Sequence, residues 1–133
     1  MNRKTKILVT ALFVSASAWS LAATGDGAWL RKVPAADRAR QNPLPHDEST
    51  PKAGQLLYMQ HCASCHGNDA GGRGKRPSLR TGRVREATDG ELQWLLKNGS
   101  LRNGMPSWSS LPEVQRWQLV RYLHSLSVSS APE

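Results

Sequence analysis

The sequence is poor in the residues that usually stabilise a small domain. Its 133 residues include one Phe, two Tyr and only two Cys, beside five Trp. The cysteines, Cys62 and Cys65, lie three positions apart, so a disulfide between them would close a very small loop and constrain little of the unfolded chain. Small cores commonly gain stability from disulfides, metals or cofactors. The available core consists of aliphatic side chains and a few indoles, and it leaves room for a component that is not protein.

The sequence also lacks any sign of β-structure. No segment alternates apolar and polar residues as a half-buried strand does, and no internal repeat is present. The length excludes two substantial domains. We therefore predict one small all-α domain with long loops.

The N-terminus carries the most pronounced apolar run of the sequence. Three basic residues within the first six positions precede an uncharged stretch, residues 7–23, which has an apolar centre and ends in small residues. This order is typical of a secretory signal peptide, which we place at residues 1–22, with cleavage after Ala18 as an alternative. An uncleaved anchor is the competing interpretation, but a spanning helix needs about 20 apolar residues and this run is short. The sequence predicts export to the periplasm.

Basic residues outnumber acidic ones. Eighteen Lys and Arg against ten Asp and Glu give a formal net charge of +8, and removal of residues 1–22 leaves fifteen against ten, or +5. Such a balance fits nucleic acid, an acidic membrane surface or acidic proteins. Export argues against nucleic acid. We expect protein partners with acidic docking faces, and membrane contact only through a membrane-bound partner or an uncleaved signal.

Prolines interrupt the segment that follows the predicted signal. Residues 23–49 contain three of them and only isolated apolar residues, which predicts an extended N-terminal arm. Two alternatives remain open for it: Trp29 and Leu30 staple the arm onto the domain, or the arm is a mobile leader. A flexible tail is predicted at residues 128–133.

The predicted folded domain, residues 50–127, begins with a helix. Thr50-Pro51 supplies a capping residue followed by proline at the first helical position, and the helix runs toward the two cysteines. Gly54 and Tyr58 share one of its faces. A glycine at such a place often indicates that another helix crosses closely.

Two further helices are predicted downstream. Thr88 and Glu91 form a capping-box pattern at the start of one, and Asn98-Gly99 ends it. The last carries a broad apolar stripe over residues 111–126. The glycine-rich segment 67–75 predicts a flexible loop.

The most informative element is the pentapeptide Cys62-Ala63-Ser64-Cys65-His66. Two thiols separated by two residues can each add to a vinyl group of one haem, while the adjacent histidine is placed to ligate its iron. A zinc site is a weaker interpretation, because His46, His61 and His124 stand at none of the usual paired spacings. A thioredoxin-type redox pair belongs to a βαβ context that is absent here, and a structural disulfide would leave His66 unexplained.

With this motif the sequence resembles the small bacterial monohaem class I cytochromes c, over about residues 50–127. Three further pieces carry the resemblance in combination: Gly54 and Tyr58 with the stretch 119–123, Arg76-Pro77-Ser78-Leu79, and Asn103-Gly104-Met105-Pro106. The family fold that this implies has three to four helices around a covalently bound haem.

The resemblance implies a role for each candidate residue. Cys62 and Cys65 would carry the two thioethers of one haem c. His66 would bind the iron through one ring nitrogen, while the other donates to a backbone carbonyl that fixes the ring. By resemblance that carbonyl belongs to Pro77.

Met105 is the candidate for the second axial ligand of the iron. Met1 leaves with the signal, and Met59 lies on the helix that leads into the motif. A lone methionine is more often part of a core, but Gly104 and Pro106 flank this one in a loop between two capped helices. A soft thioether suits iron in an electron carrier.

Two filled axial positions would leave iron free only to change its oxidation state. This predicts outer-sphere electron transfer and no enzymatic activity. Three hypotheses remain: a soluble monomeric carrier, a haem subunit of a periplasmic dehydrogenase that docks through the arm, and a catalytic or gas-sensing haem to which Met105 is not bound.

The remaining candidates have ordinary alternatives. We interpret His46, His61 and His124 as solvent residues. Trp94 and Trp108 either pack on the macrocycle or are simply buried. A basic run either neutralises propionates, docks an acidic partner or forms a solvated loop. It consists of Arg73, Lys75, Arg76, Arg80, Arg83 and Arg85.

Overall fold

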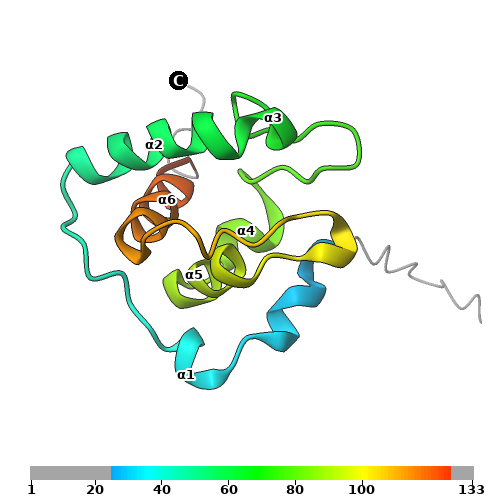
Figure 1. Ribbon diagram of the computed structural model, residues 1–133, viewed down its shortest axis with the longest axis horizontal. Coiled ribbons are helices and arrows are strands. Elements are labelled where there is room, and N and C mark those ends of the chain that lie inside the picture. Colours follow the sequence, from blue (N-terminus) through cyan, green and yellow to red (C-terminus); the bar gives the residue numbers. More distant parts are fainter. Residues whose placement is uncertain (1–24, 127–133) are drawn as a thin grey trace, which may run out of the picture.

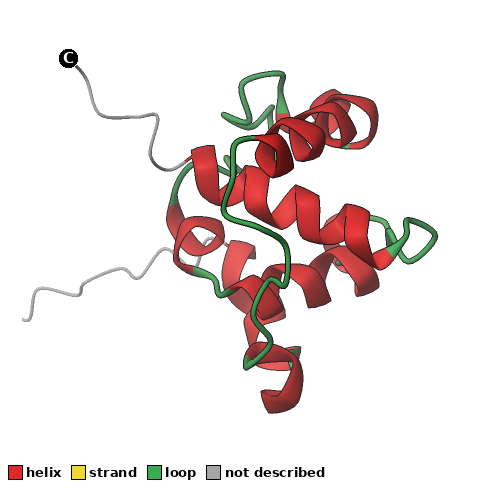
Figure 2. Cartoon of the chain, turned by 90° about the vertical axis from the view of Figure 1, so that its left-hand side faces the viewer, coloured by secondary structure: helices red, strands yellow, loops and turns green. Residues whose placement is uncertain are grey.

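The structure, a computed structural model, describes residues 25–126 (Figure 1). Over that part the elements are helices joined by loops, with two isolated β-bridges and no strand (Figure 2). The predicted all-α class is confirmed. The predicted signal peptide, residues 1–22, and tail, residues 128–133, lie outside the described residues.

A crossing pair of helices forms the frame. α2 (Ser49–His61) packs against α6 (Glu113–Leu126). A Cβ atom on Gly54 would lie 2.1 Å from the carbonyl oxygen of Gln118, so only glycine lets the two backbones approach this closely. Beside it, the rings of Tyr58 and Tyr122 lie 5.3 Å apart between centroids. The predicted close crossing at Gly54 is confirmed.

The start of α2 differs from the prediction in its capping residue. Oδ1 of Asp47 accepts hydrogen bonds from the amides of Ser49 and Thr50, each at 3.0 Å, and from both hydroxyl groups. A carboxylate offers more acceptor capacity than a hydroxyl group and complements the positive end of the helix dipole. The amide of Thr50 first, and then the Ser49 hydroxyl, hold the pKa of Asp47 below its ordinary value.

α5 (Asp89–Asn98) has the predicted boundaries. Thr88 Oγ1 accepts from the amide of Glu91 at 3.2 Å, and the Glu91 carboxylate accepts from the amide of Thr88 at 2.8 Å, which completes the capping box. Gly99 ends the helix with a φ of 70°. α5 packs on α6 and contributes its apolar side chains to the core, among them Leu92, Leu95 and Leu96.

The predicted arm is helical in its first part rather than extended. η1 (Gly25–Lys32) is a 3₁₀-helix, and the short α1 (Ala35–Arg38) follows Pro34. Proline rules out a long helix here, but it is compatible with helices that end before it or begin after it. Trp29 and Val33 are buried in the core at 5% and 6% exposure. The arm is therefore stapled to the domain.

The arm is fastened along most of its length. Asn42 connects the arm to two helices. Its backbone amide donates to the Asp89 carboxylate at 3.0 Å, and its side-chain amide donates to the carbonyl of Trp117 at 2.8 Å. A Cβ on Gly90 of α5 would lie 1.9 Å from the carbonyl oxygen of Asp37. Residues 39–48 then run along one side of the molecule to α2 (Figure 2).

The remaining elements are short. They are α3 (Ala63–His66), α4 (Gly82–Glu86), which contacts α6, and the 3₁₀-helix η2 (Leu101–Asn103). Within residues 25–126, none of the helices has the length and apolar character needed to cross a membrane.

Candidate functional site

The cysteine–histidine motif winds around the junction of α2 and α3. The amide of Cys62 donates to the carbonyl of Tyr58 at 2.8 Å, and the amide of His66 donates to the carbonyl of Cys62 at 2.9 Å. The helical path thus continues through the motif and brings Cys62, Cys65 and His66 together within little more than one turn. Both thiols are free. Cys65 is exposed and Cys62 is half-buried.

The environment of Cys62 does not favour a reactive thiolate. Burial first, and then the neighbouring Cys65, raise the pKa of Cys62 to about 11. Cysteines that exchange disulfides have a lowered pKa, since the thiolate is the nucleophile. The raised pKa of Cys62 and the absence of a βαβ unit from residues 25–126 both argue against the thioredoxin-type interpretation.

The ring of His66 is fixed by one backbone group. Its Nδ1 lies 3.0 Å from the carbonyl oxygen of Pro77. A carbonyl can only accept, so Nδ1 carries the hydrogen and the neutral ring has its lone pair at Nε2. An imidazole in this tautomer is ready to bind a metal through Nε2.

The loop that carries Pro77 is tied down, whereas the sequence predicted flexibility for residues 67–75. One contact returns to the motif, from the amide of Gly72 to the carbonyl of His66 at 2.8 Å, and another closes the loop on itself, from the amide of Leu79 to the carbonyl of Ala70 at 2.9 Å. The Tyr58 hydroxyl donates to the carbonyl of Gly67 at 2.6 Å. The glycines make these tight turns possible, and they do not make the loop loose.

Met105 closes a small backbone hairpin. Ser100 and Met105 exchange two backbone hydrogen bonds. The amide of Ser100 donates to the carbonyl of Met105 at 2.9 Å, and the amide of Met105 donates to the carbonyl of Ser100 at 3.1 Å. η2 forms the tip, and Gly104 turns the chain in the left-handed region with a φ of 73°. The Met105 side chain is half-buried and packs against the core.

The hairpin is also held from its base. A Cβ on Gly99 would lie 2.6 Å from the carbonyl carbon of Pro106, so the chain after Met105 passes directly over the end of α5. Further along, the amide of Trp108 donates to the carbonyl of Leu96 at 2.8 Å. The position of Met105 along the chain is therefore set by backbone contacts on both sides.

The interpretation of three other histidines as solvent residues holds for His46, which is exposed, and is wrong for His61 and His124, which are half-buried. The ring of His61 is half-buried and lies 5.1 Å from that of Trp108. His46 Nδ1 is 3.0 Å from an Arg121 guanidinium nitrogen, and His124 Nε2 is 3.2 Å from an Asp89 carboxylate oxygen. The rings of His61 and His124 are half-buried because the segment around Trp108 and the start of α5 lie against them, which the spacing of the residues in the sequence does not reveal.

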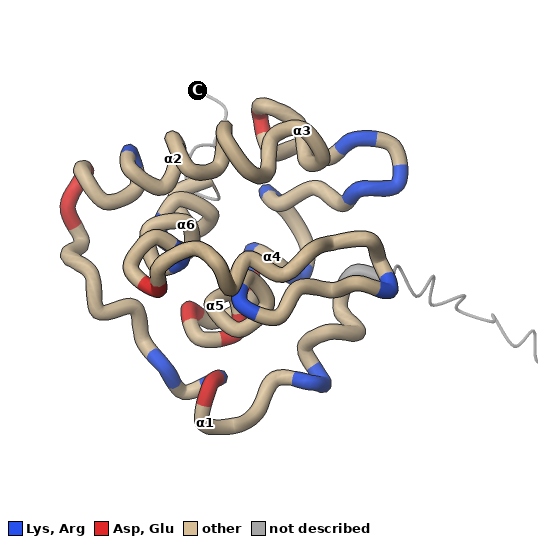
Figure 3. The backbone as a smooth tube through the Cα atoms, viewed as in Figure 1, with Lys and Arg blue, Asp and Glu red and all other residues tan. Residues whose placement is uncertain are grey.

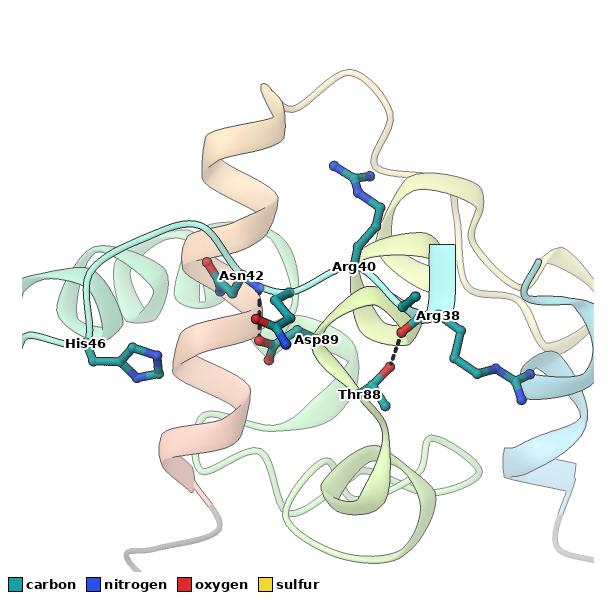
Figure 4. A pocket seen from close by; sticks show the side chains of 8 residues that line it. Arg38, Arg40, Asn42, His46, Thr88 and Asp89 are labelled. Atoms are coloured by element: carbon teal, nitrogen blue, oxygen red, sulfur yellow. Dashed lines mark hydrogen bonds between the residues drawn. The ribbon is translucent and has the colours of Figure 1, made fainter. Parts of the chain in front are cut away.

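A polar groove of about 410 Å³ lies elsewhere, between the arm and the start of α5 (Figure 4). Hydrogen bonds join its two walls, from Thr88 Oγ1 to the carbonyl of Arg38 at 3.1 Å and from the amide of Asn42 to Asp89. None of the lining residues belongs to the motif or the hairpin. The groove is a seam between the arm and α5.

The donor set fits a haem c and does not fit zinc. Within the described part of the chain, no three His, Cys, Asp or Glu side chains gather into a metal site. Two free thiols beside an imidazole with an available Nε2, together with a thioether on a separate hairpin, are the groups that attach and ligate a c-type haem.

Comparison with known proteins agrees with this chemistry. The family model described as cytochrome c oxidase, cbb3-type, subunit III matches residues 49–123, more than half of the chain. The chain belongs to this cytochrome c family. The matched region runs from the first residue of α2 into α6, so it includes the motif and the hairpin of this cytochrome c.

A solved structure supports the assignment. Cytochrome cL from the marine methylotrophic bacterium Methylophaga aminisulfidivorans matches with a TM-score of 0.53 and 26% sequence identity, over 60% of this chain and 55% of its own. The cytochrome thus spans little more than half the length of that protein. No curated protein sequence matches the chain.

Family membership establishes the cofactor. A cytochrome c of this family carries a covalent haem c with iron, and this supports haem-based electron transfer. The predicted haem c is confirmed.

Proposed function

We propose that the protein is a periplasmic carrier of single electrons whose haem is attached through Cys62 and Cys65 and ligated by His66 and Met105. The bound haem supplies a one-electron iron couple. The polypeptide holds two thiols at adjacent positions of a helical turn, presents Nε2 of the imidazole, and brings a thioether from a separate hairpin.

The fixed ring of His66 is the observation that carries the proposal. Its bond to Pro77 sets the tautomer before any metal binds and prevents the ring from turning. The paired backbone of the Met105 hairpin restrains the thioether in a similar way. Rigid ligands limit reorganisation between the two oxidation states, and axial Met ligation raises the reduction potential relative to bis-His ligation.

The arm argues for a free carrier over a dehydrogenase subunit. In the subunit hypothesis the arm is the docking element, and Trp29 would be its natural anchor. That side chain is buried in the protein's own core, as is Val33. The alternative is tested by gel filtration of native extract, in which a carrier elutes as a monomer and a subunit elutes with its enzyme.

The basic run supports acidic docking faces on the partners. Much of its charge gathers on the loop that follows α3 (Figure 3). Arg73, Lys75, Arg83 and Arg85 are exposed. Redox encounters use small interfaces that form briefly, so the rate of electron exchange with a partner should fall as ionic strength rises.

The proposal includes export and a division of the chain. Residues 1–22 would be removed as a signal, leaving the arm at residues 23–49, the haem domain at residues 50–127 and a tail at 128–133. N-terminal sequencing of the exported protein should begin at Ala23. An intact N-terminus at Met1 would contradict cleavage.

The optical spectrum is the test of the ligands. Protein exported from a host with haem-attachment machinery should give a c-type reduced spectrum and, when oxidised, the weak far-red band of iron–thioether ligation. Met105→Ala should keep the haem attached, lose that band and bind added imidazole. Met59→Ala is the matched control. If Met105→Ala keeps the wild-type spectrum, Met105 is not the ligand, and a high-spin wild type would favour the ligand-binding haem.

Covalent attachment is tested separately from ligation. A Cys62→Ala/Cys65→Ala double variant should lose the haem-stained band on a denaturing gel, because no thioether can form. An unchanged band would contradict the assignment of both cysteines.

A further inference from the structure

Arg76 joins the two loops that carry the proposed axial ligands. Its backbone pairs with Arg73, with the amide of Arg76 donating at 2.8 Å and its carbonyl accepting at 3.2 Å. The next residue is Pro77, whose carbonyl receives the His66 ring. The side chain of Arg76 leaves this loop and donates from Nη1 to the carbonyl of Asn103 at 2.8 Å, 27 positions away.

The far end of this contact is the tip of the Met105 hairpin. A Cβ on Gly104 would lie 2.7 Å from Arg76 Nη1, so the guanidinium sits against the backbone of the turn and the absent side chain gives it room. Asn103 and Gly104 immediately precede Met105. In Figure 1 the loop after α3 and the hairpin lie on the same side of the molecule.

We propose that Arg76 is a positioning residue that clamps the Met105 hairpin to the loop holding His66. The inference rests on the proposed ligation of iron by Met105. The base of the hairpin is closed by its pairing with Ser100, whereas its tip is tied to the opposite loop by Arg76. A charged donor bonded to a carbonyl makes a stronger contact than a neutral one, and the rigid guanidinium fork loses little freedom in forming it.

The clamp should act on the strength with which the thioether competes for iron. Without it, the hairpin samples positions in which the Met105 sulfur has left the iron, and an added ligand captures those states. Loss of one charge-assisted hydrogen bond corresponds to a change of about fivefold or more in such an equilibrium. The expected effect is therefore a lower dissociation constant for imidazole on the oxidised protein.

The test compares imidazole binding to the haem-loaded, oxidised wild type with that to Arg76→Ala and Arg76→Gln. Lys75→Ala is the matched control, since it removes the same charge from an exposed side chain of the same loop. We expect the Kd for imidazole to fall about fivefold or more in Arg76→Ala, and in the same direction in Arg76→Gln, while Lys75→Ala stays within about twofold of wild type. The far-red band should weaken only in the Arg76 variants.

Two results would overturn the clamp, and they are distinguishable. If the wild type shows the far-red band and an Arg76 variant binds imidazole no more tightly than Lys75→Ala does, Arg76 does not position the hairpin. If the wild type lacks the band, the proposed Met105 ligation fails and the clamp fails with it. Should Arg76→Ala yield no haem-loaded protein, Arg76→Gln decides by the same criterion.

Discussion

His66 and Met105 reach their positions through backbone partners. The Pro77 carbonyl fixes the ring of one, and the amide and carbonyl of Ser100 fix the chain at the other. A backbone carbonyl or amide keeps its hydrogen-bonding capacity when most neighbouring side chains are changed. Substitutions that move the main chain should therefore disturb the site more than substitutions that only change a neighbouring side chain.

Gly54 offers a test of main-chain placement away from the iron. A methyl group at this position would lie 2.1 Å from the Gln118 carbonyl oxygen, and that atom cannot rotate away. Gly54→Ala should lower the free energy of unfolding of the haem protein by about 1–3 kcal/mol, although alanine favours helix. Urea unfolding measures the loss. Gln55→Ala, at the exposed neighbour, should change little, and equal stability of the two variants would contradict the close crossing.

The sequence identifies the site residues by type but not by surroundings. The pentapeptide and the short list of methionines suffice to name the candidates, because few other residues have the right chemistry. The pairing of His61 with Trp108 and the contact of Arg76 with Asn103 could not be predicted. Both join segments far apart in the sequence, and neither has a local signal.

Helices with capping residues at both ends could be placed from the sequence. α5 has a capping box and a terminal glycine, and it lies where its sequence pattern places it. η1, α1 and α4 are short, so they show no helical period. Trp29 of η1 is buried and Val84 of α4 packs against the core, whereas α1 is held to α5 through the backbone and side chain of Arg38. The residue that caps α2 could not be predicted in this way, because Asp47 lies before the Thr50-Pro51 pair that indicates the start of the helix.

An ion pair between the arm and α6 should make stability depend on pH. The hydrogen bond from Arg40 lowers the pKa of Glu113 below its ordinary value of 4.5. Because the pKa is lowered in the folded state, the pair stabilises the protein above about pH 4.5, and this contribution is lost as the pH falls below that value. Both side chains are more than 40% exposed, so the contribution should be at most about 1 kcal/mol.

Glu113→Gln measures this contribution. The variant should be less stable than wild type near neutral pH, and the difference should shrink as the pH is lowered toward about 3. Arg40 also lies over the ring of Trp117, at 5.1 Å from its centroid, so Arg40→Ala alone would mix two effects. A double-mutant cycle of Glu113→Gln and Arg40→Ala separates the energy of the ion pair from the effect of an acidic residue at the start of α6. A pH-independent difference would exclude the pair as its cause.

For the whole molecule, the arm is part of the folded unit. Trp29 is among the buried side chains of the core. Trp29→Ala should lower the free energy of unfolding by about 3–5 kcal/mol, because a large buried side chain is lost and the cavity closes only in part. The far-red band should remain, because the ligands lie elsewhere.

The matched control is Arg31→Ala, an exposed change two positions along the same 3₁₀-helix. It should leave the midpoint of urea unfolding nearly unchanged. If Trp29→Ala were no less stable than Arg31→Ala, the arm would be a leader that does not contribute to the core, and the dehydrogenase-subunit hypothesis would regain its docking element.

The crossing of α2 and α6 has a consequence for the order in which the chain would mature during the proposed export. A chain that emerges from its N-terminus first delivers the cysteine motif well before α6, yet α2 needs α6 to bury Gly54 and Tyr58. The hydrogen bond from Asn42 likewise cannot form before its acceptor, the carbonyl of Trp117, is available 75 positions later. Contacts of such long sequence separation form late. Under the proposed attachment through Cys62 and Cys65, we therefore expect Cys62, which is half-buried in the folded protein, to be more accessible to the haem-attachment machinery before α6 arrives than after.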